Sequence, residues 1–298
     1  MVLQRFLLLK QIFRPGFRAA LMIVFAVLLF GCRENTNNLA EPQISSENQA
    51  SPQLEWTLSE TADDILAFGN PSGASADPSN RDNYLIRDDS AAFSYNNSRG
   101  TPNWAAWKTT ADDLGKSIPR PEFAPDRRLP AGFRRIRPAD YTGSGYDRGH
   151  LLPSADRFGR PDANERSFWM TNIVPQAGDL NQFPWRKLES YSRALVRRGL
   201  EVYTFAGVYG EMGRLRGRVT VPTNCWKVML VLERDAAVID SETRIIAVDM
   251  PNIDGIKDVG WREYRTTVRA IESKTGLDLF SSLPRELQEI LENRIDVR

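Results

Sequence analysis

Apolar residues recur along the chain with two different spacings. Five segments have the length and the β-branched or aromatic character of strands: 83–87, 92–96, 201–208, 227–232 and 244–248. Three others repeat apolar residues at helical spacing: 185–198, 261–274 and 284–293. Because strands and helices do not alternate regularly, the pattern predicts an α+β fold with a central antiparallel or mixed sheet flanked by helices.

The segment 185–198 has the clearest helical pattern. Its predicted helix starts with Pro184 in the first turn, where a missing N–H is tolerated, and ends at Gly199. Glu189 and Arg193 are four residues apart and share one face, so one edge of the helix presents an acid and a base together. The apolar residues define a largely different face: Trp185, Leu188, Tyr191 and Leu195.

The first 31 residues contain several basic residues and no acidic one. A continuous apolar run over residues 19–30 is shorter than the roughly 20 residues that a membrane-spanning helix needs. This combination is typical of a secretory signal peptide, which we expect over residues 1–31. The run ends in Leu-Phe-Gly-Cys, which resembles a bacterial lipobox and predicts a lipidated Cys32. A signal peptide cleaved nearby and an uncleaved anchor are the alternatives.

Residues 32–55 are polar and nearly free of large apolar side chains, so they predict a flexible tether. Residues 56–298 contain no repeat and no low-complexity break, which predicts one folded domain. The chain is therefore expected to be exported, either as a membrane-anchored lipoprotein on the periplasmic or extracellular side or as a freely secreted protein.

Composition and charge are those of an ordinary globular protein, with 41% hydrophobic and 26% charged residues and a formal net charge of +1. The balance does not by itself indicate a nucleic-acid-binding protein. Basic residues are nevertheless in excess over residues 114–166 and again over residues 185–218. A local positive surface of this kind can attract a polyanion even on a neutral protein.

The second of the two cysteines, Cys225, lies in an apolar segment and is expected to be a buried small hydrophobic residue. A disulfide bond to Cys32 is conceivable only if Cys32 is not lipidated and the compartment is oxidising.

His150 is the only histidine of the chain and closes the run YDRGH at residues 146–150. A histidine transfers protons near neutral pH, so it can serve as the base that deprotonates water. Taken alone, a single histidine is more often a surface residue or a satisfied core residue. The polar residues that follow it in the chain favour the catalytic interpretation.

Hydrolysis of a phosphodiester also needs a cation and groups that hold the phosphate oxygens. Asn181 can offer a carbonyl oxygen to Mg²⁺, which needs few protein ligands, and Glu189 can hold one of the waters of the ion. The guanidinium groups of Arg148 and Arg193 match phosphate oxygens in geometry. Outside this context, Asn181 could be a helix cap and Glu189 with Arg193 a solvated ion pair.

The order and spacing of these residues resemble the DNA/RNA non-specific endonucleases of the ββα-metal (His-Me finger) type. The run DRGH at 147–150 is followed by Asn181 after 31 positions and by Glu189 after 8 more. The resemblance covers about residues 66–278 and looks closest to the secreted cyanobacterial branch of sugar-non-specific nucleases. Further blocks carry it: 69–72, 102–104, 144–146, 153–157, 170–172 and 175–176.

The resemblance implies a ββα-metal finger as the active site of a metal-dependent endonuclease. Such an enzyme cleaves single- and double-stranded DNA and RNA without sequence or sugar preference and leaves 5′-phosphate and 3′-hydroxyl ends. By this resemblance, His150 is the general base and Asn181 is the only direct protein ligand of Mg²⁺ (or Mn²⁺). Glu189 binds a metal-coordinated water and helps to protonate the leaving 3′-oxygen.

Three arginines complete the implied site. Arg148 and Arg193 orient the substrate and stabilise the transition state. Arg120 is the candidate for a further substrate contact, and Arg127 or Arg128 could take that place instead.

Two other functions stay open at this point. The chain could be a nucleic-acid-binding lipoprotein without catalysis, although every implied catalytic residue is present. It could also be an enzyme narrowed to another phosphodiester. An inhibitor protein, as in some relatives, is a further candidate partner.

Overall fold

The computed structural model describes residues 54–58, 64–236 and 238–298. The predicted signal peptide, Cys32 and residues 33–53 of the predicted tether lie outside these ranges. Glu55, which the sequence analysis placed at the end of the tether, belongs to a strand. Within the described ranges, no helix is long and apolar enough to cross a membrane.

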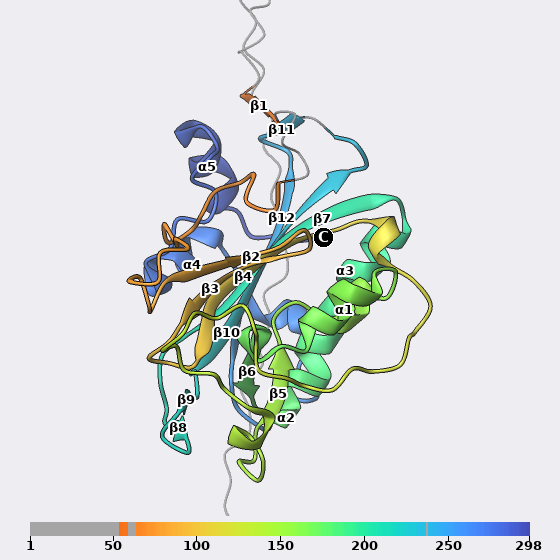
Figure 1. Ribbon diagram of the computed structural model, residues 1–298. Helices are drawn as coiled ribbons and strands as arrows, with labels where there is room; N and C mark the ends of the chain where they lie inside the picture. Colours follow the sequence, from red (N-terminus) through yellow and green to blue (C-terminus); the bar gives the residue numbers. More distant parts are fainter. Residues whose placement is uncertain (1–53, 59–63, 237) are drawn as a thin grey trace, which may run out of the picture. The chain divides into compact units, whose positions relative to one another are not determined.

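A seven-stranded sheet forms the centre of the fold (Figure 1). Its strand order is β13-β12-β10-β7-β4-β3-β2, and all neighbouring strands are antiparallel. The α+β class with a central antiparallel sheet is thus confirmed. The strands of this sheet are β2 (Tyr84–Arg87), β3 (Ala92–Asn96), β4 (Thr101–Thr109), β7 (Leu200–Tyr209), β10 (Asn224–Glu233), β12 (Arg244–Pro251) and β13 (Arg265–Thr266).

Three smaller antiparallel pairs accompany the sheet: β1 (Glu55–Thr57) with β11 (Val238–Asp240), β5 (Asp147–His150) with β6 (Ile173–Gln176), and β8 (Arg214–Leu215) with β9 (Val219–Thr220). The α-helices are α1 (Pro161–Ser167), α2 (Gly178–Leu180), α3 (Arg186–Arg197), α4 (Val268–Thr275) and α5 (Arg285–Glu292).

Hydrophobic side chains leave the sheet on both faces, because successive residues of a strand point in opposite directions. On β10, Cys225 and Met229 belong to the cluster that contains Leu188 of α3. Trp226 and Val228 belong to the cluster that contains the buried residues of α4 and α5. Helices α3 and α4 accordingly lie on opposite sides of the sheet (Figure 1).

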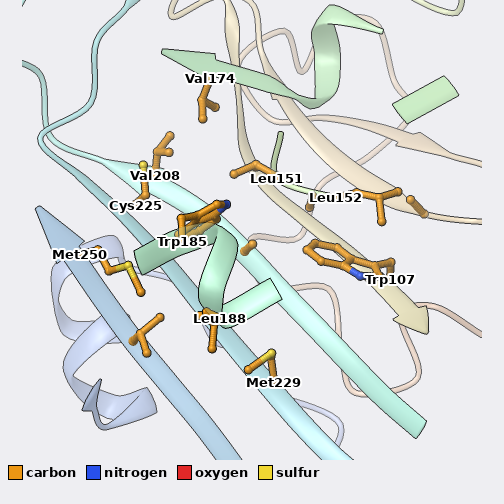
Figure 2. Packing of buried hydrophobic residues seen from close by; sticks show 14 of the residues in the cluster. Trp107, Leu151, Leu152, Val174, Trp185, Leu188, Val208, Cys225, Met229 and Met250 are labelled. Atoms are coloured by element: carbon orange, nitrogen blue, oxygen red, sulfur yellow. The ribbon is translucent and has the colours of Figure 1, made fainter. Parts of the chain in front are cut away.

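The first of these clusters also anchors the segments around His150 (Figure 2). Leu151 and Leu152, which follow His150 directly, are buried in it together with Trp185 and Leu188. Removing such side chains from water is the main favourable contribution to folding, at roughly 25 cal/mol per Å² of apolar surface. The core therefore positions the residues on either side of the predicted site.

The chain forms a β-β-α unit where the resemblance implied one. Strands β5 and β6 pair antiparallel, with Gly149 opposite Val174. A helical segment follows, made of α2, a π-helical turn over Asn181–Trp185 and α3.

Two predicted elements differ in the structure. The helix expected over 185–198 is α3 at 186–197, but helical backbone already begins at Gly178, so Pro184 lies inside the helical run and not in a first turn. The π-helical turn accommodates this proline, which lacks an N–H to donate. Gly199 follows the helix with φ +92°.

The helix expected over 261–274 is wrong in its first half. Residues 261–264 form a 3₁₀ turn, and Arg265–Thr266 pairs with β12 as strand β13. Helix α4 starts only after Thr267, whose side chain accepts a hydrogen bond from the amide of Ala270 at 3.0 Å.

Strand β4 was not predicted, since Pro102 interrupts its strand pattern. The register between β3 and β4 shifts beside this proline, because Ser94 pairs with Trp104 and Tyr95 with Pro102, which leaves Asn103 of β4 as the extra residue of a β-bulge.

Candidate active site

A cleft of about 330 Å³ brings most of the predicted site residues together. They come from the loop before Phe123, from strand β5 and from the helical segment 178–197. Arg148 lies on the same strand as His150 but is not among the lining residues. The predicted residues that do line the cleft are Arg120, His150, Asn181, Glu189 and Arg193.

His150 lies between two aromatic rings. The centroid of its imidazole is 5.4 Å from that of Phe123 and 4.8 Å from that of Phe168. Its Nε2 is buried and has no hydrogen-bond partner among the described residues. Burial, assisted by the positive charge of Arg120, lowers the pKa of His150 from 6.5 to about 3. The imidazole is therefore neutral at neutral pH and has a free nitrogen that can accept a proton.

Asn181 is oriented by a carboxylate. Its Nδ2 donates to Oδ2 of Asp147 at 2.9 Å, and Nε2 of Gln182 donates to the same oxygen at 2.9 Å. The amide of Asn181 therefore has its nitrogen committed to Asp147. Its carbonyl oxygen has no hydrogen-bond donor among the described residues, and the side chain lines the cleft, so this oxygen is available to a ligand.

Glu189 forms an ion pair with the buried Lys227. Nζ of Lys227 lies 3.6 Å from Oε1 of Glu189, and the side chains are 2% and 12% exposed, respectively. The Lys227 ammonium also lies over the ring of Trp185, 4.2 Å from its centroid. Burial raises the pKa of the Glu189 carboxyl, whereas Lys227 opposes this rise. The result is an anchored carboxyl group at the edge of the cleft.

Arg193 pairs with a different acid. Its Nη1 donates to Oδ1 of the buried Asp156 at 2.8 Å, and no direct ion pair joins it to Glu189 on the preceding turn. Oδ2 of Asp156 accepts from Nε1 of Trp107 at 3.4 Å and from the hydroxyl of Thr109 at 3.5 Å. The guanidinium is thus fixed in place while it still lines the cleft.

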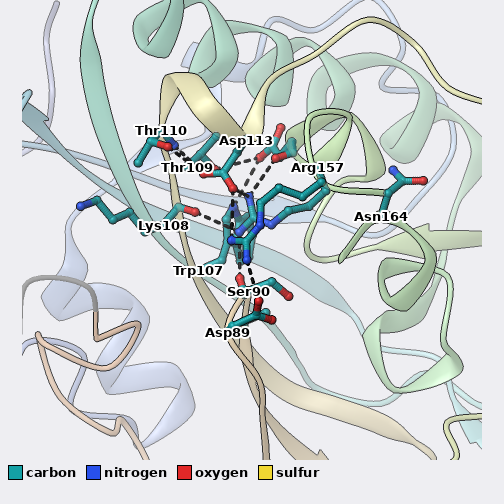
Figure 3. A network of polar contacts seen from close by, with 12 residues as sticks. Asp89, Ser90, Trp107, Lys108, Thr109, Thr110, Asp113, Arg157 and Asn164 are labelled. Carbon is teal, nitrogen blue, oxygen red and sulfur yellow. Dashed lines mark hydrogen bonds and ion pairs between the residues drawn. The ribbon is translucent and has the colours of Figure 1, made fainter. Parts of the chain in front are cut away.

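The segment that carries Asp156 is tied to the sheet by Arg157, which is almost fully buried (Figure 3). Its guanidinium donates to the main-chain oxygens of Ser90 at 2.8 Å and Lys108 at 2.9 Å. A larger cleft of about 530 Å³ lies beside this network, with acids and bases mixed in its lining. It contains none of the predicted site residues.

Arg120 and Arg148 both approach Phe123. The guanidinium carbons lie 5.4 Å and 5.5 Å from its ring centroid, respectively. Arg148 also donates to the main-chain oxygen of Pro138 at 2.9 Å, which holds it beside the cleft and not in it. Arg128, one of the two alternatives to Arg120, forms ion pairs with Asp88 and Asp126. The other alternative, Arg127, is exposed and does not line the cleft.

Sequence reasoning missed the supporting residues. Asp147 and Asp156 stand in the motif blocks at 147–150 and 153–157, but nothing in their spacing showed which side chains they contact. Lys227 had a weak signal, a lysine in an otherwise apolar strand. Arg186 also lines the cleft and was not predicted.

The cleft therefore combines a neutral imidazole with a free nitrogen, an oriented amide oxygen, an anchored carboxyl group and guanidinium groups. This set suits the attack of water on a phosphodiester, in which a base, a cation and anion-binding groups act together.

The known proteins that this chain resembles are nucleases. A model of the DNA/RNA non-specific endonuclease family matches residues 69–286. A nuclease of Nostoc sp. is 42% identical over 254 residues, which cover 84% of this chain and 92% of that protein. A nuclease of Serratia marcescens is 32% identical over 244 residues, covering 78% of this chain and 85% of that protein. Each match covers more than three quarters of this chain.

Similarity extends to the fold. The solved structure of an EndoG/EndoGI complex, described as showing the mechanism of EndoG inhibition, contains a chain that superposes with a TM-score of 0.63 at 23% identity. The superposition covers 75% of this chain and 92% of that one. The ββα finger, the cleft and the matched family together lead to one conclusion. The chain belongs to the DNA/RNA non-specific endonuclease family and is a nuclease.

Proposed function

We propose that this nuclease hydrolyses phosphodiesters of DNA and RNA with a divalent metal ion and with His150 as the general base. The observation that carries the proposal is that the buried Nε2 of a neutral His150 lies in the same cleft as the amide oxygen of Asn181, and neither atom has a hydrogen-bond partner among the described residues. An unsatisfied buried nitrogen costs free energy in the resting protein, so its retention is expected where a substrate or water binds.

The side chains present fit a hard divalent cation. Asn181 offers an oxygen ligand, and Glu189 lies in the same cleft. Mg²⁺ keeps most of its waters and needs few protein ligands, and Mn²⁺ accepts the same kind of oxygen ligands. We assign Asn181 as the direct ligand and Glu189 as the holder of a metal-coordinated water. When bound, the ion would neutralise negative charge that develops on the phosphate and the leaving oxygen.

The residues of the chain have distinct tasks in this mechanism. Nε2 of His150 takes a proton from the attacking water. Arg120 and Arg193 hold the non-bridging phosphate oxygens, and the ion pair with Asp156 keeps Arg193 oriented. Arg148 orients the substrate from the margin of the cleft. Glu189 assists proton delivery to the leaving 3′-oxygen, which leaves 5′-phosphate and 3′-hydroxyl ends.

Replacement of the base tests this mechanism. In the His150→Ala variant, Mg²⁺-dependent cleavage of plasmid DNA should fall by at least about 100-fold, since general-base catalysis contributes 10²–10⁴-fold. The fold and DNA binding should be retained, as judged by thermal unfolding and gel shift. Cleavage at the wild-type rate would refute the role of His150. A wild-type chain that binds DNA but never cleaves it would favour a silent binding protein.

The substrate range needs its own assay. We expect comparable cleavage of single- and double-stranded DNA and RNA, because groups that contact phosphate and metal read the backbone and not the base edges. Parallel digestion of all four polymers and of a small phosphodiester would reveal an enzyme narrowed to one of them.

We also propose that the chain is exported and tethered through a lipidated Cys32, by the basic and apolar character of its first 31 residues. A fatty-acid label incorporated into the wild-type chain and absent from Cys32→Ser would support the tether. Equal labelling of both would contradict it.

An inhibitor protein is a further proposed partner, and affinity capture on the His150→Ala variant would test for it.

A further inference from the structure

The tight turn between β8 and β9 has an arginine in an unfavourable backbone conformation. Arg216 has φ +47° and Gly217 has φ +68°, and the amide of Arg218 donates to the oxygen of Leu215 at 2.8 Å. Two consecutive positive φ angles define a type I′ turn, whose first central position favours Asn, Asp or Gly. Backbone outliers of this kind concentrate at functional sites.

Arg216 also has no acidic partner among the described residues. Its side chain is exposed, and Nη2 donates to the main-chain oxygen of Thr142 at 3.1 Å. The charge of Arg216 is therefore not neutralised within the described part of the chain. The other two arginines of the hairpin are paired with acids, Arg214 with Glu211 at 2.9 Å and Arg218 with Asp140 at 3.2 Å.

A chain of contacts connects Arg216 with the cleft. The hydroxyl of Thr142 accepts a hydrogen bond from Nη2 of Arg148 at 3.3 Å. The guanidinium of Arg148 lies over Phe123, which packs against His150. The β8–β9 hairpin and strand β5 lie at the same end of the folded body (Figure 1). Arg216 is thus linked to the margin of the cleft through Thr142 and Arg148.

We propose that Arg216 binds a backbone phosphate of the nucleic acid outside the scissile phosphodiester and so favours long substrates over short ones. The inference rests on the proposed function of the cleft, because that function places a nucleic-acid strand beside Arg148. A guanidinium recognises phosphate through paired N–H donors, and a strand carries a charge about every 3.4 Å along its axis. An arginine is therefore useful at this turn despite its backbone conformation.

The Arg216→Asn variant separates binding from folding. Asparagine suits the type I′ turn, so the midpoint of thermal unfolding should stay the same or rise by about 1 to 3 °C. The affinity of the full chain for a 20-base-pair duplex, measured in EDTA to prevent cleavage, should fall about 5- to 10-fold at low salt. The slope of log affinity against log salt should decrease by about one. Arg216→Lys should restore most of the affinity.

Arg234→Asn is the control, because it removes the same charge from an exposed arginine that follows the C-terminal end of β10 and is paired with Asp235 at 3.8 Å. It should leave both the affinity and the salt slope unchanged. Cleavage of a dinucleotide in Mg²⁺ should be within about twofold of wild type for both variants. Equal affinities for Arg216→Asn and the control would overturn the proposal, and so would a comparable loss on the dinucleotide. Failure of cleavage by the wild type would instead contradict the proposed function and leave the binding comparison intact.

Discussion

His150 is held in a setting that keeps its imidazole neutral. Two aromatic rings flank it and contribute to its burial, and the nearby Arg120 disfavours a second positive charge. Both effects act in the same direction on the pKa, and both are absent in the unfolded chain. The position of the residue thus favours the neutral form of the imidazole, which can accept a proton.

The pH dependence of activity should reflect this setting. We expect the inflection of kcat/KM that belongs to His150 to lie well below the ordinary histidine pKa of 6.5. In Arg120→Ala the inflection should move to higher pH, because loss of a cation favours the protonated imidazole. A pH–rate profile of both proteins between pH 4 and 9 is the measurement. An inflection at 6.5 in both would contradict the environment described for His150.

The metal role of Asn181 can be separated from its structural role. Asn181 and Gln182 both donate to Asp147, but only Asn181 lines the cleft. Asn181→Ala should reduce metal-dependent activity on the order of 100-fold or more, because it removes the only proposed direct ligand. Gln182→Ala should retain activity within about threefold. Titration with Mn²⁺ should show weaker activation only for the first variant, and equal activation would refute the ligand assignment.

At the scale of elements, the β5–β6 pair sets the direction of the base. Gly149 precedes His150 at a point where the two strands approach closely. A Cβ atom on Gly149 would lie 1.9 Å from Oε1 and 2.6 Å from Cγ of the buried Gln176. The run DRGH therefore needs glycine at its third position for reasons of space.

Gly149→Ala should accordingly disturb this pair of strands. Forcing extra volume into a packed site costs about 1 to 3 kcal/mol, so we expect a loss of stability of that size and a lower kcat. Denaturant unfolding and steady-state kinetics measure the two effects. The double variant with Gln176→Ala removes the obstacle and should recover stability relative to Gly149→Ala. No recovery in the double variant would show that the close approach to Gln176 is not the cause.

Element boundaries were predicted well where a local signal is strong. Apolar periodicity located α3 and the strands β7, β10 and β12 to within a few residues. It failed at residues 261–266 because pairing of Arg265–Thr266 with β12 overrides the helical pattern there. It also failed at β4, because Pro102 interrupts the strand pattern of that segment. The first error comes from contacts between residues that are distant in the chain, and the second comes from a proline that weakens the local strand pattern.

At the scale of the whole molecule, the sheet separates the cleft from a cluster of three carboxylates, of which Glu272 and Glu292 are buried and Asp278 is exposed. Carboxylate oxygens of Glu272, Asp278 and Glu292 lie within 4.8 Å of one another on the side of α4 and α5. Nη2 of Arg269 lies 2.5 Å from Oε2 of Glu292. Burial and the neighbouring Glu272 raise the pKa of Glu292 from 4.5 to about 8. This group affects stability and has no contact with the cleft.

Stability should therefore fall as the pH rises from about 4.5 to about 8. Since the pKa of Glu292 is higher in the folded protein, its contribution is present below pH 4.5 and is lost as pH rises through about 8. Glu292→Gln, which cannot ionise, should reduce the drop in Tm between pH 6 and pH 9 by at least about 3 °C. Calorimetry at both pH values checks this. An identical drop in the two proteins would mean that Glu292 is already ionised in the fold.

The sequence by itself determined the residue types, their order and their spacing. These were enough to predict the α+β class and the nuclease family, and to select His150, Asn181 and Glu189 as candidate site residues, because a motif consists of residue types at fixed spacing along the chain. Only the tertiary structure decided which residues the predicted site residues contact, namely Asp147 for Asn181, Lys227 for Glu189 and Asp156 for Arg193. It also placed Arg148 beside the cleft and lowered the pKa of His150 through burial and the nearby Arg120. The physical reason is that burial, charge pairing and orientation depend on distances between segments, which no spacing along the chain specifies.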